Sequence, residues 1–146
     1  MLIVPCGCRG RALAASLVEA GHAVRGTTRS QAGAEAIKAA GAEPYVGDPD
    51  RIGTLMDALS GVTIVCWLMG TIPDPDLHAG RLRMLWEKLV DTPVRGVVYE
   101  GIFPEGEAIA RGASETWQIP LEVLSGDPRG DAWVTEAVAA VDRLLS

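Results

Sequence analysis

The chain has 146 residues, of which 48% are hydrophobic and 22% are charged, and its net charge is −6. This composition is typical of a globular domain and excludes a disordered chain. No apolar run approaches the roughly 18 residues of a membrane span, so we expect no membrane partner. The acidic balance, with cations scattered along the chain, argues against a nucleic-acid surface.

The length predicts a single domain over residues 1–146, with no separate substrate domain. The first residues resemble the start of a strand and show no signal peptide, so we expect a cytoplasmic protein. The chain has an odd number of cysteines, namely Cys6, Cys8 and Cys66, which favours reduced thiols over disulfides. Their spacing matches no zinc site, and we expect no metal. The alternatives for Cys6 and Cys8 are small residues in a crowded turn, or a thiol made acidic by a helix N-terminus.

The first ten residues, MLIVPCGCRG, predict a strand, a tight turn and the start of a helix. Gly7 and Gly10 have the spacing of two glycines in a dinucleotide-binding turn, where free backbone N–H groups face a pyrophosphate. Pro5 stands where the first glycine of that pattern belongs, and its ring restricts the backbone. The turn therefore either binds a pyrophosphate or is a plain connection without a ligand.

Strand and helix patterns then alternate to the end of the chain. Gly21, Gly41 and Gly61 are predicted to end helices, while Ser30, Asp50 and Asp131 are predicted to cap them. Further strands are expected at residues 22–28, 43–46, 62–68, 95–100 and 119–124, and helices at 10–20, 31–40, 51–59, 77–90, 105–117 (interrupted by Gly106 and Gly112) and after Asp131.

This alternation predicts an α/β fold with helices on both faces of a parallel sheet of about six strands. A single doubly wound, Rossmann-like sheet with strand order 3-2-1-4-5-6 follows, with Pro120 at a sheet edge. Ligands of such sheets bind at the carboxyl ends of the strands. The segment Gly7–Gly10, the segment Met69–Thr71 and the end of the fifth strand should therefore share one rim.

The end of the second strand carries Thr28, Arg29 and Ser30 and no acidic residue. A carboxylate there favours NAD, whereas an arginine favours the 2′-phosphate of NADP. Arg29 with the two hydroxyls could hold that phosphate, and Arg9 in the glycine turn would add a second cation. The alternative is that both arginines are solvated surface residues. Asp48, after the third strand, either accepts from an adenine amino group or serves as a turn residue.

The chain resembles the short-chain dehydrogenase/reductase superfamily, in particular its atypical and extended branches, which include the NAD-dependent epimerase/dehydratase family. The resemblance rests on Gly7-x-x-Gly10, on the segment from Gly21 to Arg29, and on Asp48, and it weakens after Gly70. It implies a Rossmann fold that binds NADP, or less favourably NAD. Within this resemblance, Gly7 and Gly10 match the phosphate glycines, Arg29 the arginine of the 2′-phosphate and Asp48 the aspartate at the adenine. Together with their neighbours at the expected rim, the predicted cofactor-binding residues are Gly7, Cys8, Arg9, Gly10, Thr28, Arg29, Ser30, Asp48, Met69 and Gly70.

The catalytic Tyr-x-x-x-Lys pair of that superfamily is absent. The corresponding helix has Glu107 and Arg111, whose spacing is typical of an exposed salt bridge. The end of the fifth strand offers Tyr99 and Glu100 instead. No catalytic residue and no small-molecule substrate can be assigned from these residues.

Three functions remain open. The first is a minimal NADP-dependent oxidoreductase or epimerase, and the second is a cofactor-sensing protein without turnover. The third is a scaffold that has lost the dinucleotide, with Trp67, Trp117 or Trp133 on a partner surface. The apolar stripe of Leu82, Leu85 and Leu89 fits either the chain's own sheet or a second copy in a homodimer.

Overall fold

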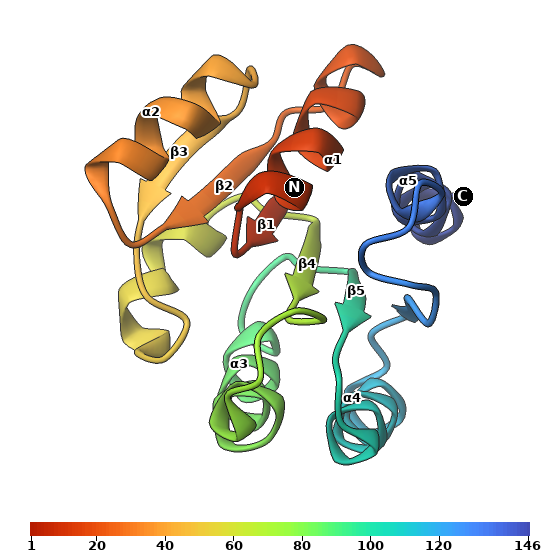
Figure 1. Ribbon diagram of the computed structural model, residues 1–146. Coiled ribbons are helices and arrows are strands. Elements are labelled where there is room, and N and C mark those ends of the chain that lie inside the picture. Colours follow the sequence, from red (N-terminus) through yellow and green to blue (C-terminus); the bar gives the residue numbers. More distant parts are fainter.

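The computed structural model describes residues 1–146. All six strands are parallel and form one sheet in the order β3-β2-β1-β4-β5-β6 (Figure 1). This is the predicted Rossmann-like architecture, in which the strand order reverses between β1 and β4. Strand β6 is an edge strand, as Pro120 indicated.

Most elements lie within a few residues of their predicted positions. The strands are β1 (Leu2–Val4), β2 (Arg25–Thr28), β3 (Glu43–Val46), β4 (Ile64–Leu68), β5 (Gly96–Glu100) and β6 (Leu121–Val123). The helices are α1 (Cys8–Glu19), α2 (Gln31–Ala39), α3 (Gly80–Leu89), α4 (Pro104–Trp117) and α5 (Trp133–Leu145), with 3₁₀ turns η1 (Ile52–Leu55), η2 (Asp57–Leu59) and η3 (Pro75–His78).

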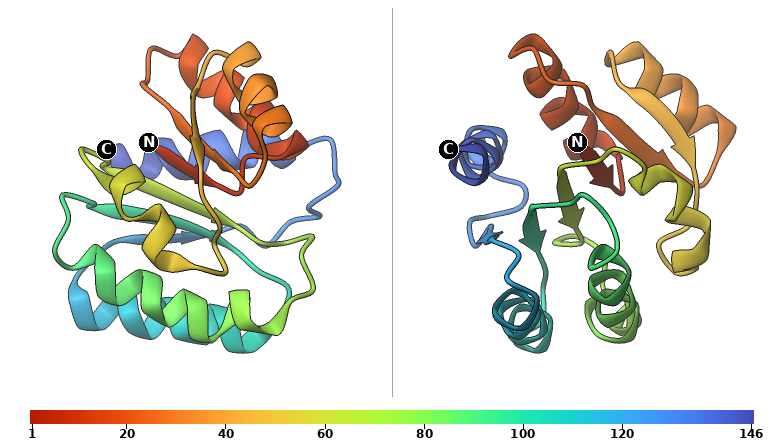
Figure 2. Two further views of the ribbon diagram at one scale, coloured as in Figure 1. Left: turned by 90° about the vertical axis from the view of Figure 1, so that its left-hand side faces the viewer. Right: turned by 180° about the vertical axis from the view of Figure 1, so that it is seen from behind.

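The helices form two layers, one on each face of the sheet. Helices α1, α2 and α5 cover one face, and α3 and α4 cover the other (Figure 2). Successive residues of a strand point to opposite faces, so each central strand contributes to two hydrophobic cores. In β4, Val65 and Trp67 face α3 and α4, whereas Cys66 faces α1 and α5. This double burial explains why β4 is apolar throughout.

Two predicted helix ends are confirmed by the backbone. Gly21 and Gly41 follow α1 and α2 with φ values of +96° and +92°, a left-handed conformation that side chains other than glycine rarely adopt. Ser30 caps α2 as predicted, because its hydroxyl accepts from the backbone N–H of Gly33 at 3.1 Å.

The helix predicted over residues 51–59 is wrong. The segment instead forms the 3₁₀ turns η1 and η2. The Thr54 hydroxyl donates to the carbonyl of Arg51 at 2.7 Å and accepts from the N–H of Asp48 at 2.8 Å, which stabilises a turn in place of a regular helix. Asp50 does not cap this segment, because its carboxylate pairs with Arg81 at 3.2 Å.

The helix predicted over residues 77–90 is divided into η3 and α3 at Ala79, whose backbone is not helical. Helix α4 is not interrupted by its two glycines. Gly106 is buried there, where a side chain would overlap Tyr99, while Gly112 faces open space. The predicted cap by Asp131 is wrong, because α5 begins after Ala132 without a side-chain cap.

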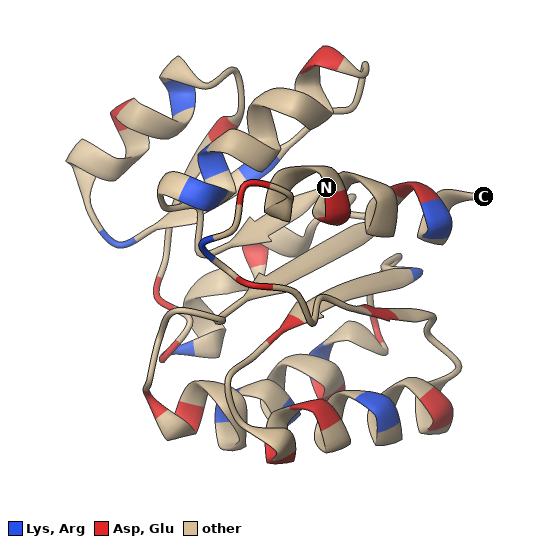
Figure 3. Ribbon diagram, turned by 45° about the vertical axis from the view of Figure 1, so that its right-hand side comes forward, with Lys and Arg blue, Asp and Glu red and all other residues tan.

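The tryptophans that were considered for a partner surface are mainly core residues. Trp67 and Trp133 are buried, and of these three only Trp117 is exposed, at 44%. The stripe of Leu82, Leu85 and Leu89 packs on the chain's own sheet, within the core shared with Val97. Charged residues lie on the outer sides of α3 and α4 (Figure 3). No helix has both the length and the hydropathy required to span a bilayer.

Candidate functional site

Two cavities lie at the carboxyl end of β1, on either side of Gly7. One has a volume of about 360 Å³ and extends past the ends of β2 and β3, where Arg29 and Asp48 line it. The other, of about 280 Å³, contains Cys8 and extends toward the end of β4. Pro5 and Gly7 line both cavities. The sheet therefore presents a divided cleft where its strand order reverses, which is where doubly wound folds bind nucleotides.

Gly7 and Gly10 have different structural roles. Gly7 precedes α1 with a φ of −82°, which any residue can adopt, and a side chain at this position would meet open space. Gly10 is buried, and a Cβ there would lie 2.9 Å from the carbonyl oxygen of Pro5 and 3.1 Å from Ile3 Cγ2. Gly10 thus allows α1 to pack against β1, while Gly7 leaves the cavity accessible to a ligand.

Pro5 lines both cavities beside this turn. The next residue, Cys6, donates its backbone N–H to the carbonyl of Thr27 at 2.8 Å, which holds the turn against the end of β2. The first backbone bond of α1 runs from the N–H of Arg11 to the carbonyl of Gly7. The preceding N–H groups of this first turn have no acceptor within the helix, and the helix dipole makes their surroundings favourable for an anion.

The end of β2 contributes Thr28, Arg29 and Ser30 to the larger cavity. Arg29 is exposed and forms no ion pair within the chain. The two hydroxyls are engaged locally, because Thr28 Oγ1 accepts from the N–H of Ser30 at 3.3 Å and Ser30 caps α2. Arg11, one helical turn after Gly7, adds a second cation to the same cavity and also has no carboxylate partner.

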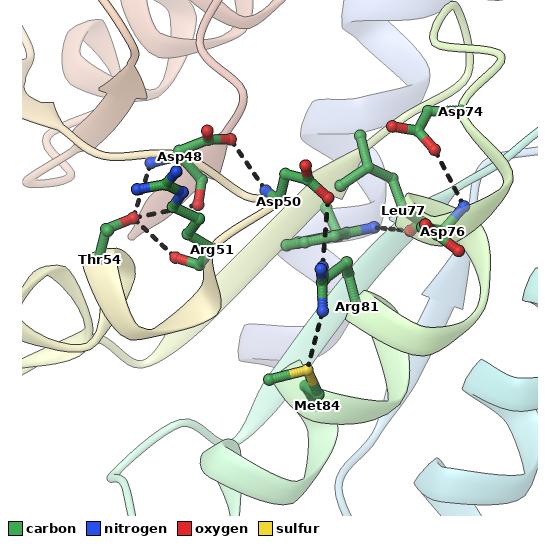
Figure 4. Close-up of polar contacts among 10 residues, drawn as sticks. Asp48, Asp50, Arg51, Thr54, Asp74, Asp76, Leu77, Arg81 and Met84 are labelled. Carbon is green, nitrogen blue, oxygen red and sulfur yellow. Dashed lines mark hydrogen bonds and ion pairs between the residues drawn. The ribbon is translucent and has the colours of Figure 1, made fainter.

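Asp48 also lines this cavity. Its Oδ1 accepts from the N–H of Asp50 at 2.9 Å, and its backbone N–H donates to Thr54 Oγ1 at 2.8 Å (Figure 4). Asp48 is therefore a turn residue, and its second carboxylate oxygen has no hydrogen-bond partner in the chain. Asp74 similarly shapes the loop after β4, since its carboxylate accepts from the N–H of Asp76 at 3.1 Å.

Arg9 is paired with Glu100. Its guanidinium donates to Glu100 Oε2 at 2.9 Å, lies 2.8 Å from Oε1, and stacks over the Trp133 ring at 4.4 Å. Glu100 also accepts from Trp133 Nε1 at 2.6 Å and from the N–H of Gly70 at 3.0 Å. This network joins the first turn of α1 to the ends of β4 and β5 and to the start of α5. The charge of Arg9 is thereby compensated within the chain.

The remaining predicted site residues lie around this network. The Cys8 side chain is exposed and lines the smaller cavity. Met69 is buried in the hydrophobic core, although its position directly follows β4. Gly70 lines a separate cavity of about 240 Å³ that contains Glu100, and a side chain at Gly70 would overlap the Glu100 carboxylate. Gly70 therefore serves the network rather than the cleft beside Gly7.

No catalytic pair replaces the missing tyrosine and lysine. Arg111 Nε lies 3.2 Å from Glu107 Oε2 in a half-exposed salt bridge along α4. Tyr99 is buried in the core under α4, and its hydroxyl has no hydrogen-bond partner. Burial raises the pKa of Tyr99 to about 12, and the nearby Glu107 carboxylate contributes in the same direction. The phenol is therefore a hydrogen-bond donor at neutral pH.

Sequence reasoning missed Arg11 and Trp133 as residues of the site. The position of Arg11 one helical turn after Gly7 is a signal that could have been used, because that spacing places it on the same face of the helix. Trp133 had no local signal, since its contact with Glu100 joins residues 33 positions apart. The described residues include no group of three His, Cys, Asp or Glu side chains that could hold a metal ion.

Comparison with known proteins found no matching family model and no matching curated protein. Solved structures do match. The triphenylmethane reductase of Citrobacter sp., solved with NADP(H), has a TM-score of 0.65 and 19% identity, over 84% of this chain and 47% of that one. The NADPH-dependent quinone oxidoreductase QOR2 of Escherichia coli, solved with NADPH, has a TM-score of 0.70 and 19% identity, over 97% of this chain and 53% of that one.

A UDP-glucuronic acid 4-epimerase from Bacillus cereus, solved with NAD, has a TM-score of 0.62 and 12% identity, over 84% of this chain and 54% of that one. The chain thus spans about half the length of these structures. At such identities the likeness concerns the fold. The predicted Rossmann fold is confirmed, because the chain shares it with these structures solved with NADP(H) or NAD.

Proposed function

We propose that this chain binds NADP(H) in the divided cleft on either side of Gly7. The observation that carries the proposal is the pair of cations, Arg29 and Arg11, which line the larger cavity without carboxylate partners of their own. A phosphate with two negative charges would neutralise them. The absence of an acidic residue at the end of β2 favours the 2′-phosphate over a free ribose hydroxyl.

The cleft fits the parts of a dinucleotide. The pyrophosphate would lie at the N-terminal turn of α1, beside Gly7, which lines both cavities and whose Cβ position has no neighbouring atom within 4 Å. Thr28, Arg29 and Ser30 would surround the 2′-phosphate, and the free oxygen of Asp48 would accept from the adenine amino group. Solved structures with the same fold contain NADP(H), which supports the same cofactor here.

The residues of the chain would position the cofactor, which supplies hydride chemistry when bound. Cys8, which lines the smaller cavity, would lie near its nicotinamide half. We therefore propose an NADP-dependent oxidoreductase or epimerase of the atypical kind, with a proton donor that is not a Tyr-x-x-x-Lys pair.

A second candidate is a cofactor-sensing protein without turnover. Two observations favour it: Glu107 is paired with Arg111, and Tyr99 lacks the cation that would lower its pKa. This protein would bind NADPH and show no oxidation of the cofactor with any carbonyl substrate. A scaffold that has lost the dinucleotide is less consistent with the structure, because the cleft beside Pro5 and Gly7 is open.

The test is a comparison of NADPH and NADH by thermal shift and by nicotinamide fluorescence. We expect NADPH to raise the melting temperature at lower concentration than NADH, since stabilisation grows with the logarithm of ligand concentration over Kd. Arg29→Ala should abolish this preference and leave NADH binding nearly unchanged. Arg143→Ala is the matched control, because Arg143 pairs with Glu122 near the C-terminus of α5. If neither cofactor binds, or if Arg29→Ala retains the preference, the proposal fails.

A further inference from the structure

The two cavities beside Gly7 differ in their charge. The larger one is lined by arginines and aspartates together, namely Arg11, Arg29, Asp48, Asp50 and Asp74. The smaller one, of about 280 Å³, is lined by Arg9 and Arg129 and by no acidic residue. Arg9 is compensated by Glu100, whereas Arg129 is exposed and forms no ion pair. An anion is therefore attracted to the smaller cavity without opposition from carboxylates in its wall.

Arg129 belongs to a tight turn in the connection between β6 and α5. The Asp127 carboxylate accepts from the backbone N–H of Arg129 at 2.9 Å, and the Asp127 carbonyl accepts from the N–H of Gly130 at 3.0 Å. The Gly130 carbonyl accepts in turn from the N–H of Trp133 at 3.2 Å, and the Trp133 ring carries the guanidinium of Arg9. The turn is thus fixed next to the start of α1, which reduces the entropy lost when Arg129 binds a ligand.

The smaller cavity also contains donors from two other segments. Thr71, in the loop after β4, is half-buried, and its hydroxyl forms no hydrogen bond within the chain. Gly7 and Cys8 contribute the first turn of α1, whose N–H groups have no acceptor within the helix. Donors from three distant segments therefore share one cavity with an uncompensated cation. Such a set suits an anion with several oxygen atoms.

We propose that Arg129 binds the diphosphate of the dinucleotide, at the phosphate that adjoins the nicotinamide ribose, with Thr71 as a further donor. The inference rests on the proposed function, because it assigns a residue to the same cofactor site. With the adenosine and its 2′-phosphate beside Arg29 in the larger cavity, the chain of phosphates would pass Gly7, which lines both cavities, and enter the smaller one. A guanidinium can donate two parallel hydrogen bonds to a phosphate, whereas an ammonium is a point charge.

This assignment separates the effects of Arg129 and Arg29. The diphosphate is common to NADPH and NADH, whereas the 2′-phosphate belongs to NADPH alone. Arg129→Ala should therefore weaken both cofactors to the same extent and keep the preference for NADPH. We expect a loss of about tenfold, which corresponds to one hydrogen bond between charged groups. Arg129→Lys should recover part of this loss, and the loss should shrink as the salt concentration is raised.

The experiment measures NADPH and NADH by nicotinamide fluorescence, and two further ligands by calorimetry. These are 2′-phospho-ADP-ribose and adenosine 2′,5′-bisphosphate, which share the 2′-phosphate, whereas only the first contains the diphosphate. Arg129→Ala should weaken 2′-phospho-ADP-ribose about tenfold and the bisphosphate less than about twofold. Arg95→Ala is the matched control, because Arg95 is equally exposed and unpaired but precedes β5, at the opposite end of the sheet.

Three results would overturn the inference. Unchanged affinity of Arg129→Ala for NADPH would show that Arg129 does not touch the cofactor. A loss for NADPH without a loss for 2′-phospho-ADP-ribose would place Arg129 at the nicotinamide, and equal losses for 2′-phospho-ADP-ribose and the bisphosphate would exclude the second phosphate. The melting temperature without ligand should equal that of the wild type, since the Arg129 side chain forms no ion pair or hydrogen bond in the chain.

The outcome also distinguishes this inference from the proposed function. A wild-type protein that binds neither NADPH nor NADH would refute the proposed function. A wild type that prefers NADPH, and loses this preference in Arg29→Ala but keeps full affinity in Arg129→Ala, would refute the role of Arg129 alone.

Discussion

Glu100 binds the guanidinium of Arg9, 91 residues earlier in the chain, with both carboxylate oxygens at 2.9 and 2.8 Å. The carboxylate is almost fully buried, while Arg9 retains about a fifth of its side-chain exposure. Since Glu100 also accepts from Trp133 and Gly70, its removal would leave several donors unpaired. This single side chain connects both halves of the sheet at the rim of the cleft.

Glu100→Gln should therefore destabilise the protein. Loss of the buried charge leaves Arg9 uncompensated, and the partial exposure of Arg9 reduces the cost to about 2 kcal/mol. Urea denaturation measures this change. Glu107→Gln is the control, because the exposed Glu107–Arg111 pair along α4 should contribute less than about 0.5 kcal/mol. Equal effects of the two variants would contradict the importance of the network.

Substitution of the two glycines of the turn by alanine should have different effects. Gly10→Ala places a methyl group 2.9 Å from the Pro5 carbonyl oxygen, so we expect a loss of about 1–3 kcal/mol in the free energy of unfolding. Gly7→Ala meets no neighbour in an ordinary backbone conformation and should leave stability nearly unchanged. It should nevertheless weaken NADPH binding at least tenfold, because its methyl group projects into the cleft. Unimpaired NADPH binding by Gly7→Ala would place the pyrophosphate elsewhere.

Alkylation should distinguish the three thiols. Cys8 is exposed, whereas Cys6 and Cys66 are buried. Burial raises the pKa of Cys6 to about 11 and that of Cys66 to about 12, which keeps both unreactive at neutral pH. We expect iodoacetamide to modify Cys8 alone, as read by mass spectrometry of the peptides. NADPH should slow this modification, since Cys8 lines the smaller cavity, and the protection should follow the Kd from thermal shift.

The same buried thiols predict how stability depends on alkaline pH. In the unfolded chain a thiol ionises near its ordinary pKa of 9.0, whereas folded Cys66 ionises only near 12. The unfolded state therefore releases its proton first, and the free energy of unfolding should fall between about pH 9 and 12. The expected slope is about 1.4 kcal/mol per pH unit for each such thiol. Below about pH 9, where Cys66 is protonated in both the folded and the unfolded state, its ionisation should not change the free energy of unfolding.

Urea denaturation at pH 8, 9 and 10 tests this dependence. Cys66→Ala should be less stable at pH 8 but should have a shallower slope above pH 9, because one of the ionising thiols is gone. Cys8→Ala is the matched control, since Cys8 is exposed and should leave the slope unchanged. A slope in Cys66→Ala as steep as that of the wild type would show that another group is responsible.

The architecture of this protein was accessible from local sequence patterns. Continuous apolar runs such as residues 64–68 indicated strands buried on both faces, and alternation with helices predicted the parallel sheet and its order. Helix ends at Gly21 and Gly41 were equally accessible, because left-handed backbone depends on the residue itself. The helix predicted over residues 51–59 was wrong, because hydrogen bonds of the Thr54 side chain stabilise turns there although the apolar residues have helical spacing.

The candidate site was likewise predictable from the sequence only in part. Gly7, Gly10 and Arg29 belong to segments whose position at the rim follows from chain order and strand direction alone. The sequence by itself therefore determined the fold and the location of the cleft. Only the tertiary structure decided that Arg9 pairs with Glu100 and stacks on the Trp133 ring. It also decided that the Tyr99 hydroxyl is buried without a partner. These relations depend on contacts between distant segments, which local periodicity does not encode.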